Sequence, residues 1–244
     1  MGVERLQPSG MFLTAEWRDL AMLNYEVDPA LLRKFVPSGT ELDTWNRKTF
    51  LSLVGFRFLK TKLCGLSLPF HRNFDEVNLR FYVRRSEGDQ VKRGVVFIRE
   101  IVPRWWIAAV ARTFYNERYV ALPMSHNIER DGSALAVEYR WKLGTSRNRI
   151  RATAKQSPRM PANGSQEEFI SEHYWGYAAQ KDGGCIEYQV QHPPWKVWTT
   201  TDAIFEGDME ALYGKELDAV LKHPPQSAFL AEGSAVSVHR GRRL

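Results

Sequence analysis

Residues 76–83 read Glu76-Val77-Asn78-Leu79-Arg80-Phe81-Tyr82-Val83, with polar and apolar side chains in strict alternation. Successive side chains of a β-strand point to opposite faces, so this stretch predicts a strand with one apolar and one polar face. The polar face carries Glu76, Asn78, Arg80 and Tyr82. Two interpretations are open. Either the polar face lies in water, or it lines the inside of a curved sheet and orients a small polar ligand.

The sequence around this stretch contains more strand signals than helix signals. Apolar or alternating runs predict strands over residues 20–27, 49–59, 94–102, 133–143, 186–190, 196–204 and 234–239. Capping residues and helical spacing predict helices over residues 28–35, 104–115, 165–172 and 207–221. Because strands and helices do not alternate regularly, we expect a mainly β (α+β) fold with a curved antiparallel or mixed sheet.

The composition is that of an ordinary globular protein. Of the 244 residues, 43% are hydrophobic and 25% are charged, which argues against a disordered chain. The length suits one large β-rich domain, so we expect residues 1–244 to form a single domain. The sequence begins without a secretory signal and contains no apolar run long enough to span a membrane, which predicts a cytoplasmic protein.

The two cysteines, Cys64 and Cys185, cannot form a disulfide framework, and they lack metal-ligand spacing. His173 and His192 are not at metal-ligand spacing either. No serine nucleophile elbow and no glycine-rich phosphate loop occurs. The sequence therefore predicts no metal and no cofactor. Whether His173, His192 or Lys196 reaches a cavity is left open, as is the oligomeric state.

The formal net charge of +6 raises the question of nucleic-acid binding. The basic residues are scattered, with short clusters only at residues 147–151 and 239–243. We expect a solvated surface and a frayed C-terminus there, and we rank nucleic-acid binding lowest because no known nucleic-acid motif is present. Arg112, near the end of a predicted helix, either complements the helix dipole or binds a carboxylate.

The stretch from Phe74 to Val83 resembles the signature of the YqjF-like family of uncharacterised conserved proteins. Four further pieces agree with the family in order: Trp17-Arg18-Asp19-Leu20, Glu138-Tyr139-Arg140, Glu172-His173-Tyr174 and His192-Pro193-Pro194-Trp195. The resemblance covers residues 11–240. This family is similar to a branch of the acetoacetate decarboxylase-like superfamily. The resemblance implies a curved sheet that closes into a barrel with a few peripheral helices and an internal ligand cavity, with Glu76, Asn78 and Arg80 facing that cavity.

The decarboxylases of that superfamily act through a Schiff-base lysine next to a second lysine. The best match to their motif is at residues 111–120, where Arg112 takes the place of the motif's arginine and Thr113 replaces its glutamate. Tyr119 and Val120 stand where the lysine pair would be. A tyrosine cannot form an imine, so we expect no Schiff-base chemistry.

These observations predict a small-molecule pocket protein, and the first interpretation is an enzyme that acts on a small organic acid or carbonyl compound. Arg80 and Arg112 would hold a carboxylate or an enolate, and Glu76 would accept or donate a proton. Asn78, Tyr82 and Tyr119 would orient the ligand, which we expect to be anionic. The alternative is a ligand-binding or sensing module without catalysis.

Overall fold

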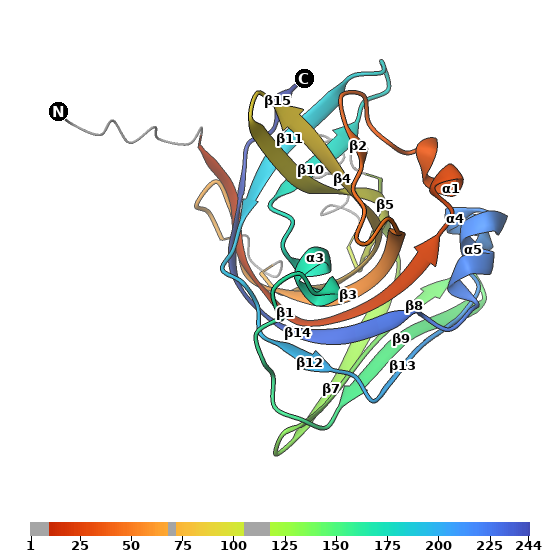
Figure 1. Ribbon diagram of the computed structural model, residues 1–244. Coiled ribbons are helices and arrows are strands. Elements are labelled where there is room, and N and C mark those ends of the chain that lie inside the picture. The colour runs from red at the N-terminus through yellow and green to blue at the C-terminus, as the bar shows by residue number, and fades with distance from the viewer. Residues whose placement is uncertain (1–9, 68–71, 105–117) are drawn as a thin grey trace.

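The computed structural model describes residues 10–67, 72–104 and 118–244. Most of the helix predicted over residues 104–115, with Arg112, lies outside the described residues. The described chain is mainly β, as the sequence predicts, and its strands form two sheets (Figure 1). Most predicted strands are present, although the structure extends several of them beyond the predicted ends.

The larger sheet is strongly curved. Its strands follow the order β12 (Val197–Thr199), β14 (Ser227–His239), β1 (Met11–Val27), β3 (Thr49–Leu63), β4 (Phe74–Glu87), β5 (Gln90–Val102), β10 (Trp175–Ala179), β11 (Cys185–Gln191) and β15 (Arg242–Arg243). In addition β11 pairs with β14, so the strands from β14 through β11 form a closed ring. The short strands β2 (Glu41–Leu42) and β6 (Tyr119–Ala121) pair with β4 and β5. The sheet is mixed because β5 runs parallel to both β10 and β6.

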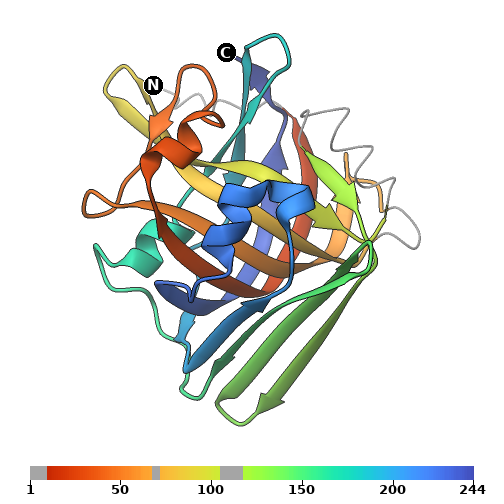
Figure 2. The same cartoon turned by 90° about the vertical axis from the view of Figure 1, so that its right-hand side faces the viewer.

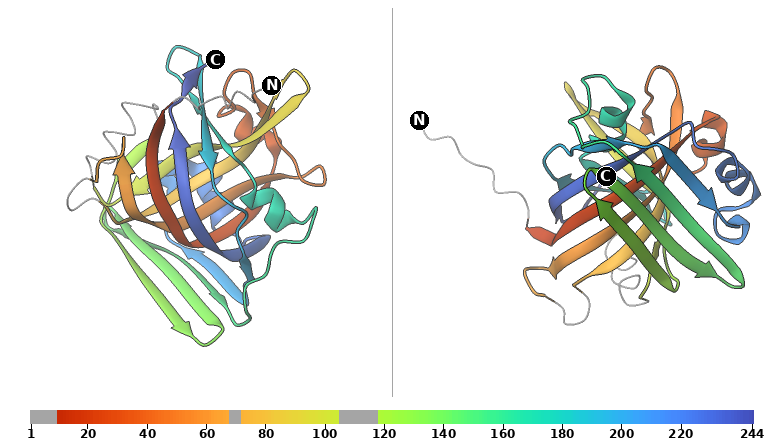
Figure 3. Two further views of the ribbon diagram at one scale, coloured as in Figure 1. Left: turned by 90° about the vertical axis from the view of Figure 1, so that its left-hand side faces the viewer. Right: turned by 90° about the horizontal axis from the view of Figure 1, so that it is seen from below.

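The smaller sheet is antiparallel and has the order β13 (Asp202–Glu206), β9 (Ser146–Ala154), β8 (Ala134–Leu143) and β7 (Met124–Asp131). It extends from the ring at an angle, which is clear in both side views (Figures 2 and 3). Gly55 of β3 allows the two sheets to approach closely, since a Cβ at this position would lie 2.6 Å from Cδ2 of Tyr139. The hydroxyl of Tyr139 donates to the backbone oxygen of Asp19, 2.8 Å away.

Two helices of the described chain begin as their caps predict. Asp28 accepts a hydrogen bond from the Ala30 amide at the start of α1 (Pro29–Arg33). Ser165 accepts from the Glu168 amide at the start of α3 (Gln166–Ser171). Helix α3 lies across one end of the ring (Figures 1 and 2), and its Phe169 and Ile170 pack into the ring interior.

Three local predictions are wrong. The helix expected over residues 207–221 is two helices, α4 (Glu210–Tyr213) and α5 (Lys215–Leu221), because Gly214 adopts a φ of 84° and ends the first. The strand expected over residues 196–204 is divided between β12 in one sheet and β13 in the other. The C-terminus is not frayed, since β15 pairs with β11.

Both faces of β4 are buried from Asp75 to Val83, which decides between the two interpretations of its alternation. The apolar face, with Val77, Leu79 and Phe81, packs in a core shared with the smaller sheet. The polar face points into the ring rather than into water. The curvature of the larger sheet therefore converts a polar strand face into the wall of an interior space.

Candidate functional site

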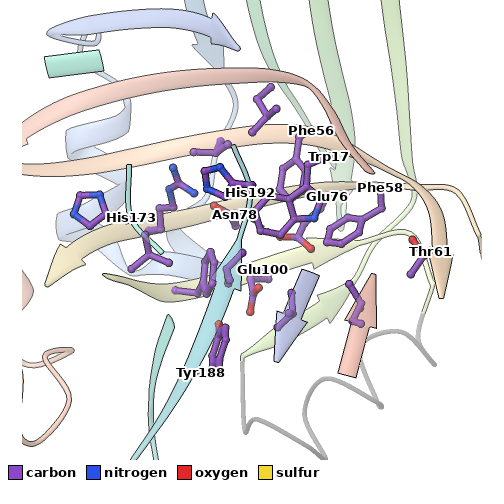
Figure 4. A pocket seen from close by; sticks show the side chains of 18 of the residues that line it. Trp17, Phe56, Phe58, Thr61, Glu76, Asn78, Glu100, His173, Tyr188 and His192 are labelled. Carbon is purple, nitrogen blue, oxygen red and sulfur yellow. Dashed lines mark hydrogen bonds between the residues drawn. The ribbon is translucent and has the colours of Figure 1, made fainter. Parts of the chain in front are cut away.

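A pocket of about 160 Å³ lies inside the ring (Figure 4). Side chains from β1, β3, β4, β5, β6, β10, β11, β14 and the α3 segment line it, and most of them are apolar. The polar residues that line it are Thr61, Glu76, Asn78, Arg80, Glu100, Tyr119, Ser171, His173, Tyr188 and His192. An apolar pocket with a few converging polar groups has the usual construction of a small-molecule site.

Glu76 and Asn78 form the centre of the polar wall. Nδ2 of Asn78 donates to Oε1 of Glu76 over 2.9 Å. The Tyr119 hydroxyl donates to Oε2 of Glu76 over 3.3 Å. The side chains of Glu76 and Asn78 are almost completely buried. Thus the carboxyl group of Glu76 is held in a fixed orientation by one donor on its own strand and one donor from β6.

Burial raises the pKa of Glu76 to about 7. The hydrogen bonds from Asn78 and Tyr119 and the positive charge of Arg80 act in the opposite direction, and they keep the shift from being larger. A carboxyl group with a pKa near 7 is present in both protonation states at neutral pH. It can therefore donate or accept a proton.

Arg80 is a buried cation, with 8% of its surface exposed. Its Nη2 donates to the backbone oxygen of Ile170 over 3.3 Å, and its guanidinium lies 5.7 Å from the centre of the Tyr82 ring. Within residues 10–67, 72–104 and 118–244 it forms no ion pair, and its Nε has no hydrogen-bond partner. A buried arginine is normally paired with an anion, so this side chain is suited to receive one from a ligand.

The structure brings four of the six predicted site residues to one pocket. Glu76, Asn78, Arg80 and Tyr119 line the same pocket. Tyr82 is buried beside the pocket, where its hydroxyl hydrogen-bonds Oγ of Ser52 at 2.7 Å. Ser52 in turn donates to Asn24, so Tyr82 belongs to a polar network across the strands. Arg112 lies outside the described residues.

The pocket lining also contains polar groups that the alternation of residues 76–83 does not reveal, Glu100 and His173 among them. Glu100 stands opposite Asn78 on β5 and is buried. His173 also lines the pocket, and its Nε2 lies 3.3 Å from Oδ2 of Asp43, which Arg93 binds at 2.6 Å. Burial lowers the pKa of His173 to about 4, so the imidazole is neutral at physiological pH. Since both residues come from other segments, only the strand register and the fold bring them to the pocket that Glu76 lines.

His192 lines the pocket as well, whereas Lys196 does not. His192 stacks on Trp195, with ring centres 4.1 Å apart. Every lysine of the sequence falls within the described residues, and none of them lines the pocket. The pocket lining formed by the described residues therefore contains no lysine amine.

Two features are absent from the described residues. No group of three or more histidine, cysteine, aspartate or glutamate side chains there has the arrangement of a metal site. Among the same residues, no helix has the length and apolar character needed to cross a membrane.

Comparison with known proteins gives the family and the fold. Residues 14–235 match the model of the family DUF2071, described as an uncharacterized conserved protein. The uncharacterized protein YqjF of Bacillus subtilis is 27% identical over 231 residues, which cover 87% of this chain and 92% of YqjF.

Two similar solved structures are enzymes. Acetoacetate decarboxylase of Legionella pneumophila superposes with a TM-score of 0.65 at 14% identity, covering 100% of this chain and 92% of that chain. The enduracididine biosynthesis enzyme MppR, in its complex with pyruvate, superposes with a TM-score of 0.67 at 13% identity. The superposition covers 98% of this chain and 93% of MppR. At such low identity the likeness shows the fold alone. The chain belongs to the DUF2071 family of uncharacterised conserved proteins and has the fold of the acetoacetate decarboxylase-like enzymes.

Proposed function

We propose that this protein binds a small organic anion inside the ring and exchanges a proton with it through Glu76. The observation that carries the proposal is Arg80, a buried cation with no ion pair in the described chain, four residues from a buried carboxyl group on the same strand face. A carboxylate or an enolate oxygen would complete the interactions of the guanidinium. Arg112 stays a predicted second ligand for this anion.

The proton step follows from the state of Glu76. As a carboxylate it would remove a proton from the carbon next to the ligand's carbonyl group, which leaves an enolate and a protonated Glu76. Arg80 would stabilise the negative charge on the enolate oxygen. Return of the proton to the same carbon regenerates the ligand, so the step is balanced without a co-reactant. Asn78 and Tyr119 would hold the Glu76 carboxyl group in place.

Two further findings support this type of ligand. MppR, which shares the fold, forms a complex with pyruvate, a small acid with a carbonyl group. The absence of lysine from the pocket lining disfavours decarboxylation through an imine, while proton transfer needs no amine. An enolisable 2-oxo acid is therefore a suitable first probe.

Binding is tested by thermal melting of the full chain with a panel of organic acids that includes pyruvate and acetoacetate. We expect at least one acid to raise Tm for the wild type and for Arg33→Met, a control on the exposed surface of α1. The rise should disappear in Arg80→Met. An equal rise in Arg80→Met would remove Arg80 from the site.

Proton exchange is tested by NMR in deuterium oxide with the acid that binds. The wild type should speed exchange of the protons next to the carbonyl group, and Glu76→Gln should bind the acid but lose the rate enhancement. Binding without exchange in the wild type would refute the catalytic half of the proposal and would favour a sensing or carrier module.

A further inference from the structure

We infer that the ligand of this pocket carries an aromatic or similarly bulky apolar group in addition to its acid group. This inference rests on the proposed function and concerns the part of the pocket that the acid group does not need. Its basis is the arrangement of the lining residues along β1, β3 and β4. Along β4, the aromatic Phe74 precedes the polar lining residues.

The strand register places aromatic residues in one row. Trp17 pairs with Phe58, and Phe58 pairs with Phe74, so three rings from three strands lie side by side. Phe58 stacks on Phe74 with ring centres 4.6 Å apart, and Trp17 meets Phe58 edge to face at 5.8 Å. All three residues line the pocket, and together they form its aromatic wall.

The polar groups follow in order along β4 from this wall. Glu76 is two residues from Phe74 and pairs with Phe56, another lining ring. Asn78 comes next, and Arg80 lies six residues from Phe74, roughly 20 Å along the strand at about 3.3 Å per residue. An acid group held by Arg80 leaves first Phe56, opposite Glu76, and then the aromatic wall for the rest of the ligand. Glu76 then lies between the acid group of the ligand and the aromatic wall.

The pocket is large enough to hold an aromatic ring. Its volume is about 160 Å³. A cavity of about 150 Å³ with apolar walls is large enough to bind benzene. A two- or three-carbon acid would fill only part of this space. It would leave the aromatic wall without a contact to the ligand. Filling a poorly hydrated apolar space with an apolar group favours binding.

The test compares pyruvate with phenylpyruvate by isothermal titration calorimetry on the full chain. The two acids share the 2-oxo acid group and differ by a phenyl ring. We expect phenylpyruvate to bind at least about tenfold more tightly, because even one methylene in an apolar pocket can change binding by that factor. Both acids should lose their binding in Arg80→Met.

Phe74→Leu trims the aromatic wall and should reduce the preference for phenylpyruvate to a few-fold. Phe205→Leu is the matched control, because Phe205 is also partly buried but packs on Trp141 in the smaller sheet. Circular dichroism checks that both variants are folded. The comparison of pyruvate with phenylpyruvate on the wild type does not depend on either variant.

The outcomes separate the two proposals. Equal affinity of the two acids, both dependent on Arg80, would overturn the aromatic ligand and leave the proposed function standing. Phenylpyruvate binding that persists unchanged in Arg80→Met would show a general apolar pocket and would overturn the inference. If neither these acids nor any other acid of the panel binds, the proposed function fails and the inference fails with it.

Discussion

At the scale of single residues, opposing effects act on the pKa of the Glu76 carboxyl group. Burial favours its neutral form, while Asn78, Tyr119 and Arg80 favour the ionised form, and the result is a pKa of about 7. The alternation of residues 76–83 predicts that Glu76, Asn78 and Arg80 share a strand face, and the structure places all three in the pocket lining. The carboxyl group on this face is therefore ionised only at a cost in stability.

Glu76→Gln should stabilise the protein at pH 8 more than at pH 5. The pKa of Glu76 in the folded protein is higher than its ordinary value of 4.5, so the folded state binds this proton more tightly. Stability from this group is complete below pH 4.5 and is lost as the pH rises through 7. Glutamine does not titrate, so the gain at pH 8 should reach at most about 3 kcal/mol. Urea denaturation at both pH values measures it.

The control for this experiment is Glu232→Gln, which changes an exposed glutamate on β14. It should alter the free energy of unfolding by less than about 0.5 kcal/mol at either pH. A gain from Glu76→Gln that is the same at pH 5 and pH 8 would contradict a raised pKa at this residue.

His173 should make the protein less stable in acid. Its pKa of about 4 in the folded protein is below the ordinary 6.5. Between these values the unfolded chain binds a proton that the folded protein excludes, so stability falls as the pH is lowered from 6.5 towards 4, by up to about 3 kcal/mol. His173→Gln should flatten this part of the stability profile. The exposed His223→Gln serves as the control, and equal slopes in the two variants would contradict the prediction.

At the scale of elements, local signals in the sequence predict strands and helix caps well. They do not predict where tertiary contacts interrupt a helix. Residues 207–221 have continuous helical periodicity, and one glycine inside such a pattern costs a helix only about 1 kcal/mol. In the structure Met209 is fully buried, and its amide donates to Oδ1 of Asp218 at 2.7 Å. This tertiary contact, with Gly214 at a φ of 84°, favours two short helices over one. The sequence alone does not contain that contact.

Gly55→Ala tests how closely the two sheets pack. The added methyl group would lie 2.6 Å from Tyr139 and 3.2 Å from Ile150, both in the buried core. Overpacking of this kind typically costs about 1–3 kcal/mol, so we expect a loss of that size in chemical denaturation. Gly10→Ala is the control, since a Cβ there meets nothing within 4 Å. A neutral Gly55→Ala would show that the sheets can separate without cost.

At the scale of the whole molecule, closure of the ring could not be derived from residue patterns. The seam joins β11 to β14 through only two residue pairs, Val190 with Val238 and Gln191 with Ser237, and long-range pairing of this kind leaves no local signal. The family resemblance did imply a closed scaffold. Separation in sequence also explains why Glu100 was not predicted to line the pocket and why the place of His173 was left open.

The basic clusters are also understood only in the folded molecule. Arg149 pairs with Glu206 and Glu138, and Arg243 lies against Asp182 in an ion pair. Pairing with carboxylates reduces the positive charge that these clusters present to a polyanion. We therefore continue to expect no salt-sensitive nucleic-acid binding, which a gel-shift assay at low and high salt would check.

Arg242 links the C-terminal strand β15 to the ring, and its removal should weaken that attachment. It binds Glu187 and Glu87 at 2.8 Å and 2.7 Å, and the Glu187 side chain is fully buried beside Arg85 and Lys92. Those two cations remain in Arg242→Ala, and Arg242 itself is half exposed, so the loss should be modest, about 1 kcal/mol. It should shrink at 1 M salt, where exposed ion pairs are screened.

The exposed Arg240 provides the matched control, two residues earlier in the same tail. Arg240→Ala should leave the free energy of unfolding nearly unchanged at both salt concentrations. Arg242 forms an ion pair with the buried Glu187, and Arg240 does not. Urea denaturation of both variants at 0.05 M and 1 M salt measures the difference. If Arg242→Ala and Arg240→Ala behave alike at low salt, the C-terminal strand is not held to the ring by this ion pair, and the backbone pairing of β15 with β11 must suffice.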